Sequence, residues 1–424
     1  MIKLKRIIAI VMIAIMSTIF ITGCKSTDKS NDGNGDKEKL VVWLPPLADN
    51  DKEAWKPILE KFESENNCEI ELELIPWDNY AEKYATAISA GEGPDIGYMY
   101  AEMFPQFIEM GAVEDLTSYL SDEDYENYLY IDSAKMMGGI YGLPIEAANP
   151  GVLFYNKDIL EKLGEQPPKT WDDFIRICEK STQDTDGDGK IDQWGLAQGW
   201  GSKTFGSLNW NWYPYLWQSG GDIYNEDLKT VKFNDEAGLE AAEFLVKLKD
   251  YIPEDALSKN TSEMIESVFG PGDAAFTIML SSTAKYVFDE SFPDLNWGFV
   301  TSLENKDVGA FASVDDITLM SAAENKELAF KLMQHMLSAE SMNEFHKMIP
   351  RAPVTKGEKY QGDPRFEEMI ERDKDMYRPL MVGPHGVEIY EYLWKQLQSM
   401  IAGDITPKEA LDEAARYAND LLAQ

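Results

Sequence analysis

The chain has 424 residues and a formal net charge of −36, from 75 acidic and 39 basic side chains. This charge repels polyanions and argues against nucleic acid as a partner, while 44% hydrophobic and 12% aromatic residues indicate a packed globular protein. Because one core rarely holds more than about 250–300 residues, the length predicts two lobes.

The first residues predict a secreted, lipid-anchored protein. Basic residues at 3–6 precede an apolar run at 7–21, which is shorter than the roughly 20 residues that a membrane-spanning helix needs. The run ends in Ile-Thr-Gly-Cys, which resembles a bacterial lipobox whose cysteine is diacylated. We expect a signal peptide at 1–23, a lipid anchor at Cys24 and a flexible polar tether at 24–38 that holds the protein outside a bacterial cell membrane.

The next segments alternate between strand and helix patterns. Strands are predicted at 39–44, 69–75 and from Ile96, and helices at 51–65, 80–90 and 104–110. This order favours an α/β lobe with a mainly parallel sheet and helices on both faces. Ligands bind beyond the carboxyl ends of strands in such sheets. The loop after Trp43 and the segment 99–102 are therefore candidate ligand-binding segments. The alternative is ordinary packing at strand ends.

The stretch 141–158 predicts a strand that crosses between lobes. Gly142 and Pro144 interrupt the chain, a small-residue segment follows at 147–151, and a strand-forming run occupies 152–155. The pattern alone is also typical of any loop that leads into a strand.

A helix is predicted from Thr170, which can cap it, to Lys180, with Trp171 packing at its entry. The loop that follows has oxygen-bearing residues at alternating positions, which suits a hard cation such as calcium. The predicted ligands are Asp184, Asp186, Asp188, Lys190 (through its carbonyl) and Asp192. The pattern matches an EF-hand-type loop except at its twelfth position, where Gly195 replaces glutamate. The alternative is a solvated acidic turn.

Residues 195–224 concentrate aromatic side chains among Gly, Ser and Asn. Aromatic faces suit the apolar faces of pyranose rings, and polar neighbours can take the hydroxyls. Core packing is the alternative, and it is favoured for Trp217, which lies one helical turn after Tyr213. Either Trp210→Ala or Trp212→Ala is expected to weaken ligand binding and to leave the fold intact.

The remaining segments predict further elements of both lobes. Helices are expected at 233–251, 324–337 and 390–401, and strands at 274–280 and 297–300. Cys68 and Cys178 are interpreted as buried free thiols, although a disulfide between them is possible.

Seven segments resemble those of a known protein family and occur in the family's order along the chain. They are AISAGEGPDI (87–96), YGLP (141–144), LFYNKDIL (153–160), PPKTWDDF (167–174), AAFTIML (274–280), MIPRAPV (348–354) and IAGDITPKEALDEA (401–414). The set resembles the extracellular solute-binding proteins of carbohydrate ABC importers, the maltose-binding-protein-like group, over nearly all of the chain after residue 38. The resemblance implies a two-lobed α/β fold with hinge crossings, a sugar in the interlobe cleft and a permease in the membrane as partner.

The resemblance also implies domains and site residues. The N-terminal lobe would comprise 39–148 plus 316–354, and the C-terminal lobe 149–315 plus 355–424, with a return crossing near Ser313–Ile317. Relatives carry small residues at that crossing, so the two aspartates here are a departure that suits sugar hydroxyls or a cationic ligand group. The residues expected to contact ligand are Trp43, Tyr100, Glu102, Asn149, Trp210, Trp212, Ser282, Asp315, Asp316 and Trp394. For Trp394, as for Tyr390 on the same helix face, core packing is an equal alternative.

No catalytic residues are expected. The chain has three histidines and neither a Gly-x-Ser-x-Gly nor a His-Glu-x-x-His motif, and no carboxylate pair is distinguished for glycoside hydrolysis. We therefore expect a monomeric oligosaccharide-binding protein with structural calcium. A binder of peptides or polyamines is the alternative, followed by a glycoside hydrolase.

Overall fold

The structure is a computed structural model that describes residues 37–424, except positions 49, 148–149, 226–227, 313, 379 and 381. The predicted signal peptide, the anchor Cys24 and the predicted ligand residue Asn149 lie outside the described residues. Within the described part of the chain, no helix is long and apolar enough to cross a membrane.

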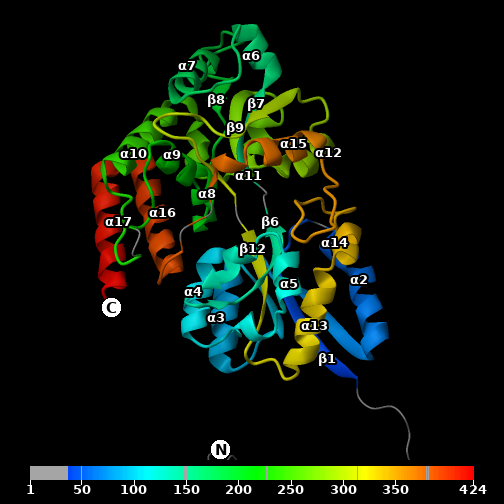
Figure 1. The fold of residues 1–424 in the computed structure, drawn as a ribbon. Helices are drawn as coiled ribbons and strands as arrows, with labels where there is room; N and C mark the ends of the chain where they lie inside the picture. The colour runs from blue at the N-terminus through cyan, green and yellow to red at the C-terminus, as the bar shows by residue number, and fades with distance from the viewer. Residues whose placement is uncertain are drawn as a thin grey trace, which may run out of the picture. The chain divides into compact units, whose positions relative to one another are not determined.

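A five-stranded sheet forms the N-terminal lobe, in the order β2-β1-β3-β12-β6. Its strands are β1 (Glu38–Leu44), β2 (Cys68–Leu74), β3 (Ile96–Met99), β6 (Leu143–Ala147) and β12 (Val314–Leu319). The first three run parallel to one another, whereas β12 pairs antiparallel with both β3 and β6. In Figure 1, α3 (Tyr80–Ala90) and α4 (Phe104–Glu109) lie to the left of β12, and α2 (Asp51–Asn66), α13 (Lys326–Met336) and α14 (Ala339–Phe345) lie to its right.

A four-stranded sheet forms the C-terminal lobe, in the order β10-β7-β9-β8. Its strands are β7 (Gly151–Asn156), β8 (Trp194–Leu196), β9 (Ala274–Leu280) and β10 (Trp297–Val300). Its helices are α6 (Lys157–Leu163), α7 (Trp171–Ser181), α8 (Leu208–Asn211), α9 (Tyr213–Gln218), α10 (Glu236–Leu248), α11 (Thr261–Met264), α12 (Asp289–Ser291), α15 (Pro364–Arg372), α16 (Gly386–Ala402) and α17 (Pro407–Leu422). A short helix α5 (Asp122–Asn127) and the strand pairs β4 (Lys135–Met136) with β5 (Gly139–Ile140) and β11 (Ala310–Phe311) with β13 (Tyr377–Arg378) complete the described elements.

Both sheets are mixed, although the sequence predicts mainly parallel sheets. The α/β class is confirmed, but β12 and β6 belong to crossings between lobes and not to successive β-α-β units. In the C-terminal sheet, β7 pairs antiparallel with β9 and β10, and only β8 with β9 is parallel. The β-α-β rhythm holds for β1 to β3 and, through α8 to α11, for the parallel pair β8 and β9.

Local signals position the helices well. Thr170 accepts a hydrogen bond from Asp173 N at 3.2 Å and forms a capping box, as predicted for the start of α7. The helix predicted at 233–251 begins later, at Glu236, because Asp235 caps it by accepting a hydrogen bond from Gly238 N at 3.0 Å. Its last turn, Lys249–Tyr251, is a 3₁₀ helix.

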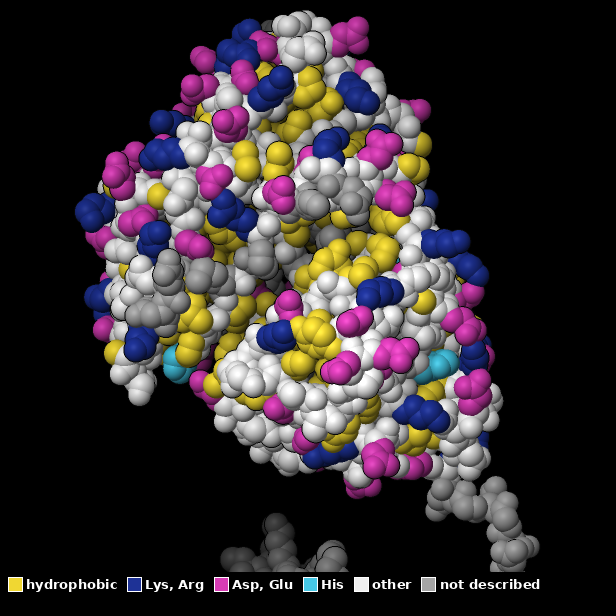
Figure 2. Space-filling view, viewed as in Figure 1, with side chains coloured by type: hydrophobic (Ala, Val, Ile, Leu, Met, Phe, Trp, Pro, Cys, Tyr) yellow, Lys and Arg dark blue, Asp and Glu magenta, His cyan; other side chains and the backbone are white. Residues whose placement is uncertain are grey.

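Two separate hydrophobic cores match the two sheets. Val354 belongs to the N-terminal core and Phe366 to the C-terminal core, so the chain changes core between these residues. Cys68 and Cys178 are buried free thiols, one in each core, as expected. Figure 2 shows acidic side chains spread over the viewed face and not gathered in one patch. This distribution is typical of charge that keeps a protein soluble.

Candidate functional site

The crossing between lobes brings the edges of the two sheets together. β6 ends at Ala147 in one sheet, and β7 begins at Gly151 in the other. Ala147 pairs with Val314, the first residue of β12, while Gly151 pairs with Leu280, the last residue of β9. The carboxyl ends of β1, β2 and β3 lie at the same edge of the N-terminal sheet as this crossing, because β12 runs antiparallel to β3. This edge is where an α/β sheet binds ligands.

An aromatic cluster lies at the carboxyl end of β3. The ring of Tyr100 lies 6.3 Å from that of Trp77 and 6.4 Å from that of Tyr80. Tyr80 Oη in turn donates a hydrogen bond to the carbonyl oxygen of Tyr98 at 2.9 Å. These contacts hold Tyr100 partly buried at the sheet edge. The predicted site residue Tyr100 is therefore placed where a ligand can reach its ring.

Three carboxylates surround the cluster. Tyr98 Oη donates a hydrogen bond to Asp315 Oδ2 at 2.7 Å, which orients this carboxylate. Glu102 is only 6% exposed, and burial raises the pKa of its carboxyl to about 7. Burial, together with the charges of Glu102, Glu391 and Asp315, raises the pKa of the Tyr100 hydroxyl. Carboxylate oxygens can accept hydrogen bonds from the hydroxyl groups of a ligand or bind a cation.

The C-terminal lobe contributes polar atoms that the described residues do not satisfy. Asn209 Oδ1, Trp210 Nε1 and Tyr213 Oη are buried without a hydrogen-bond partner among those residues. The carbonyl oxygen of Asn209 lies 3.8 Å from the position a Cβ would take at Gly151, so this segment lies beside the start of β7. Buried polar atoms are rarely left unpaired in folded proteins. These atoms therefore mark a place for bound water or a polar ligand.

Contacts between the lobes join the aromatic cluster around Tyr100 to the segment around Asn209 and Trp210. The rings of Tyr100 and Phe205 lie 6.2 Å apart, and Phe205 lies 6.1 Å from Tyr390 of α16. The carbonyl oxygen of Glu102 lies 3.6 Å from the position a Cβ would take at Gly386, the first residue of α16. Aromatic rings and carboxylates from both lobes thus line one region.

Three of the predicted ligand residues are buried in the cores. Trp43 is 8% exposed and packs edge-on against Tyr84 at 5.2 Å. Trp212 is 0% exposed in the C-terminal core, whereas Trp210 beside it is half-buried. Trp394 is 2% exposed, stacks on Trp200 at 5.4 Å and donates Nε1 to the carbonyl oxygen of Ser202. These indoles supply packing area in the structure, and the Nε1 atoms of Trp43 and Trp212 have no hydrogen-bond partner among the described residues. Their contact with a ligand stays a prediction.

Two further predicted ligand residues, Ser282 and Asp316, lie away from the aromatic cluster's surface. Ser282 is half-buried and lines a cavity of about 30 Å³ together with Lys285, Arg351 and Tyr360. Asp316 is 1% exposed. A Cβ added at Gly142 would lie 2.6 Å from the Cβ of Asp316, so the two residues are in close contact. Asp316 is thus packed inside the N-terminal lobe, although its neighbour Asp315 lies at the cluster. Trp217, predicted to be a core residue, is 2% exposed, as expected.

The sequence interpretation missed one aromatic residue of the region, Trp77, which is 41% exposed. Phe205, which bridges the lobes, lies in the aromatic stretch 195–224 that the sequence singles out, and Tyr390 shares the predicted helix face of Trp394. A Trp-Asp-Asn turn two residues after the second strand could have pointed to Trp77, because it lies at a strand's carboxyl end. Within the stretch 195–224, no local signal distinguishes Phe205 from the other aromatic residues.

Burial of Asp316 predicts a pH dependence of stability. Burial, and then the charge of Asp315, raise the pKa of Asp316 well above its usual value. The folded protein therefore keeps a proton that the unfolded chain releases, so the free energy of unfolding falls as the pH rises above about 4. Asp316→Asn removes this titration. The variant is expected to be more stable than the parent at about pH 7, with a difference that shrinks toward about pH 4.

Urea unfolding of both proteins across this pH range measures the difference directly. The titrating groups other than Asp316 and its coupled neighbour Asp315 keep the same surroundings in both proteins, so their contributions cancel in the comparison. Two parallel stability curves would contradict a raised pKa at Asp316.

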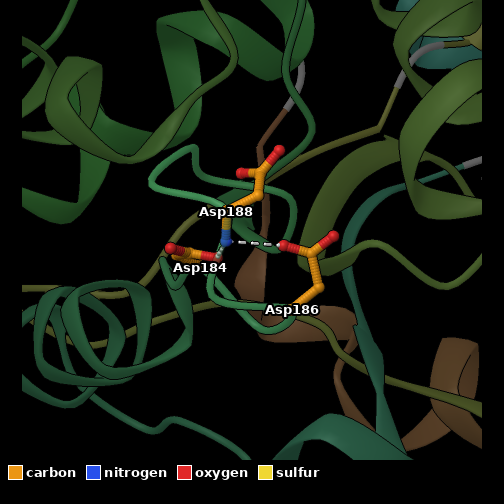
Figure 3. Close-up of side chains that lie close together, drawn as sticks. All are labelled: Asp184, Asp186 and Asp188. Carbon is orange, nitrogen blue, oxygen red and sulfur yellow. Dashed lines mark hydrogen bonds between the residues drawn. The ribbon is translucent and has the colours of Figure 1, made fainter.

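The acidic loop after α7 brings three carboxylates together. Asp184, Asp186 and Asp188 each place one oxygen within 4.8 Å of the others. Figure 3 shows the backbone nitrogen of Asp188 between two of these carboxylates, and it donates to Asp186 Oδ1 at 3.0 Å and to Asp184 Oδ1 at 3.2 Å. Carboxylate oxygens at such spacing fit a calcium ion.

Two other positions of the predicted calcium loop, Asp192 and Gly195, have structural roles. Asp192 Oδ1 accepts hydrogen bonds from Thr185 N at 2.9 Å and Thr185 Oγ1 at 2.8 Å, so it closes the base of the loop. Gly195 lies in β8, where an added Cβ would come within 2.8 Å of the Cα of Cys178. A glutamate at the twelfth position is therefore sterically excluded. The three clustered aspartates, with the Lys190 carbonyl as a further candidate, are the residues that would hold the ion.

The chain was compared with known proteins. A family model described as bacterial extracellular solute-binding protein matches residues 46–343. The galactooligosaccharide-binding protein of Bacillus subtilis is 24% identical over 434 residues, with 98% of this chain and 97% of that protein covered. A maltose/maltodextrin-binding domain from Bdellovibrio bacteriovorus bound to maltotriose has a TM-score of 0.76 at 21% identity and covers 91% of this chain and 100% of its own. An ABC substrate-binding protein from Listeria monocytogenes in complex with cycloalternan has a TM-score of 0.75 at 23% identity, with coverages of 92% and 100%.

Proposed function

The chain belongs to the bacterial extracellular solute-binding protein family, and we propose that it captures an oligosaccharide between its lobes and delivers it to an ABC permease. The observation that carries the proposal is the meeting of rings and polar atoms from both sheets. Tyr100 and Glu102 lie on one side, and Phe205 and Trp210 lie on the other. Aromatic faces bind the apolar faces of sugar rings, and carboxylates accept hydrogen bonds from their hydroxyls. Relatives that bind oligosaccharides support the choice of ligand class.

Capture of the ligand follows from the arrangement of the crossings. A sugar that contacts Tyr100 of one lobe and Trp210 of the other gains both sets of contacts only when the lobes close around it. The ligand therefore shifts an open–closed equilibrium by its differential affinity for the closed form. A permease that recognises the closed form then receives loaded protein. Binding needs no chemical change in the ligand.

A cationic solute such as a polyamine is the second candidate. It is favoured by the three carboxylates near Tyr100, namely Glu102, Glu391 and Asp315. A positive group would neutralise the buried Glu102 more fully than a hydroxyl can. Peptides with a free amino group belong to the same candidate class.

A thermal-shift screen distinguishes these candidates. Full-length protein in a sugar-free detergent is tested with galactotriose, maltotriose, cycloalternan, tagatose, spermidine and a tripeptide. A ligand that binds only the folded state raises the melting temperature by mass action. We expect a rise with an oligosaccharide that is recovered intact. A rise only with spermidine or the peptide would favour the second candidate, and cleavage of the sugar would indicate a hydrolase.

The location proposed for the protein is the outer face of a bacterial cell membrane. A diacyl group on Cys24 would anchor the chain, and the polar residues up to position 38 would act as a tether. Mass spectrometry of the detergent-extracted protein tests this proposal. An N-terminus that begins at an unmodified residue would contradict it.

We further propose that calcium binds the acidic loop and stabilises the C-terminal lobe. The three carboxylates of Asp184, Asp186 and Asp188 repel one another without a cation, and their spacing suits one. Asp186→Asn keeps an oxygen that can accept the hydrogen bond from Asp188 N but removes one negative charge. At calcium about 100-fold above Kd, the parent should gain about 2.7 kcal/mol in the free energy of unfolding. The variant should lose most of this gain.

Chemical unfolding with calcium and with a chelator measures both values. Asp420→Asn, an exposed aspartate on α17, serves as the matched control and should respond to calcium like the parent. Equal stability of parent and Asp186→Asn in calcium would contradict the proposal. So would a loss that is the same in chelator.

A further inference from the structure

Trp77 is unusual among the tryptophans of this protein. The chain has 11 tryptophans, and Trp77 is the one that the structure exposes, at 41%. Tryptophan is highly buried in most folded proteins because its large apolar area stabilises the core. A single exposed apolar side chain is nevertheless common on protein surfaces, so a role for Trp77 has to rest on its orientation and its position.

The exposed indole is held in one orientation. Its Nε1 donates a hydrogen bond to the carbonyl oxygen of Pro46 at 3.0 Å. The ring lies 5.4 Å from that of Tyr80 at 37° and 6.0 Å from that of Tyr98 at 79°. A side chain with its ring fixed before binding loses little rotamer freedom when a ligand arrives. The structure thus presents a preformed aromatic surface and not a loose side chain.

Trp77 lies next to the proposed site, on its solvent side. Trp77 begins a 3₁₀ turn (Trp77–Asn79) just after β2, at the carboxyl edge of the N-terminal sheet. Its ring is 6.3 Å from that of Tyr100, which in turn is 6.2 Å from that of Phe205 in the other lobe. The three rings form a row that leads from the lobe contact toward solvent. Trp77 is the outermost of the three.

We propose that Trp77 is an outer subsite that stacks one ring of a bound oligosaccharide, next to the ring held at Tyr100. The inference rests on the proposed function and adds which residue holds the second sugar ring. An indole face matches the apolar face of a pyranose, and the nearby carboxylate of Asp315 can accept a hydrogen bond from a hydroxyl of the inner ring. A single sugar at Tyr100 would leave Trp77 uncovered.

The test compares short and long sugars on matched variants. Titration calorimetry of the full-length protein measures the binding of galactose and galactotriose, and of glucose and maltotriose, to the parent, Trp77→Ala and Trp77→Phe. Loss of the stacking should weaken trisaccharide binding about tenfold in Trp77→Ala. Monosaccharide binding should be unchanged, and Trp77→Phe should retain most of the affinity. Met110→Ala removes an apolar side chain of the same lobe that is 46% exposed and should behave like the parent.

Fluorescence separates stacking from a structural effect. A trisaccharide on the ring should protect the exposed indole from acrylamide quenching in the parent, and the protection should be absent in Trp77→Phe. If Trp77→Ala binds the trisaccharide as tightly as the parent, the subsite is wrong while the proposed function stands. If the two sugars lose affinity equally, Trp77 acts on the fold and the subsite is again wrong. If the parent binds no saccharide, both proposals fail.

Discussion

Replacement of Trp212 by alanine is expected to lower the free energy of unfolding by about 3–5 kcal/mol. The indole is 0% exposed and packs within the C-terminal core between α8 and α9. Its removal leaves a cavity that the surrounding core can fill only in part, and the free energy lost grows with the volume left empty. The sequence alone predicts weaker ligand binding and an intact fold for this variant, so the structure changes the expected result.

Trp210→Ala is the matched control, because the two residues share one short segment. Trp210 is half-buried, whereas Trp212 is fully buried, and the Nε1 atoms of both have no hydrogen-bond partner among the described residues. Removal of the Trp210 indole should change stability by only about 1 kcal/mol and weaken oligosaccharide binding. Urea unfolding and calorimetry of both variants give the comparison. Normal stability of Trp212→Ala with lost binding would contradict the buried placement of Trp212.

Arg351→Ala is expected to lower the free energy of unfolding by a similar amount, about 3–5 kcal/mol. Arg351 Nε donates to Glu146 Oε1 at 2.7 Å, and the two side chains are 5% and 8% exposed. The guanidinium also donates to the carbonyl oxygens of Pro350 at 2.9 Å and Leu47 at 3.3 Å. Loss of the arginine leaves the Glu146 carboxylate buried without its cation. The segments that meet at the lobe crossing would then be less firmly joined.

Two comparisons identify the cause of this loss. Arg416 pairs with Glu413 at 2.6 Å on the surface, with side chains 61% and 40% exposed, so Arg416→Ala should cost less than about 1 kcal/mol. The double variant Arg351→Met with Glu146→Leu removes both charges and should recover most of the stability, because buried pairs can be replaced by apolar groups. A double variant as unstable as Arg351→Ala would show that the unpaired charge is not responsible.

Local patterns in the sequence determined much of this protein. The alternation of apolar residues predicted α2, α3 and the strands near their observed ends, because periodicity reflects the face that each element buries. The capping residue Thr170 and the spacing of the aspartates in residues 184–188 also act over a few positions. Their geometry follows from the backbone between them, so the capping box and the carboxylate cluster could be predicted.

Tertiary structure decided which aromatic rings are exposed. Trp210 and Trp212 are two positions apart in a segment rich in aromatic residues, and no period distinguishes the one that faces the core. Trp43 and Trp394 show the same ambiguity, since a strand end or a helix face can turn toward a core or toward a ligand. The neighbouring elements settle the choice: Trp394 stacks on Trp200, and Trp43 packs against Tyr84.

The contacts that assemble the proposed site join distant parts of the chain. Glu146 and Arg351 are 205 positions apart, and Tyr98 and Asp315 are 217 apart. Tyr100 meets Phe205 only because β6 and β7 place two sheets on either side of one crossing. Such pairs leave no periodic trace in the sequence, because they depend on how whole sheets are joined. The sequence thus determined the elements and the carboxylate cluster of the acidic loop, and the packing of the lobes decided which side chains can meet a ligand.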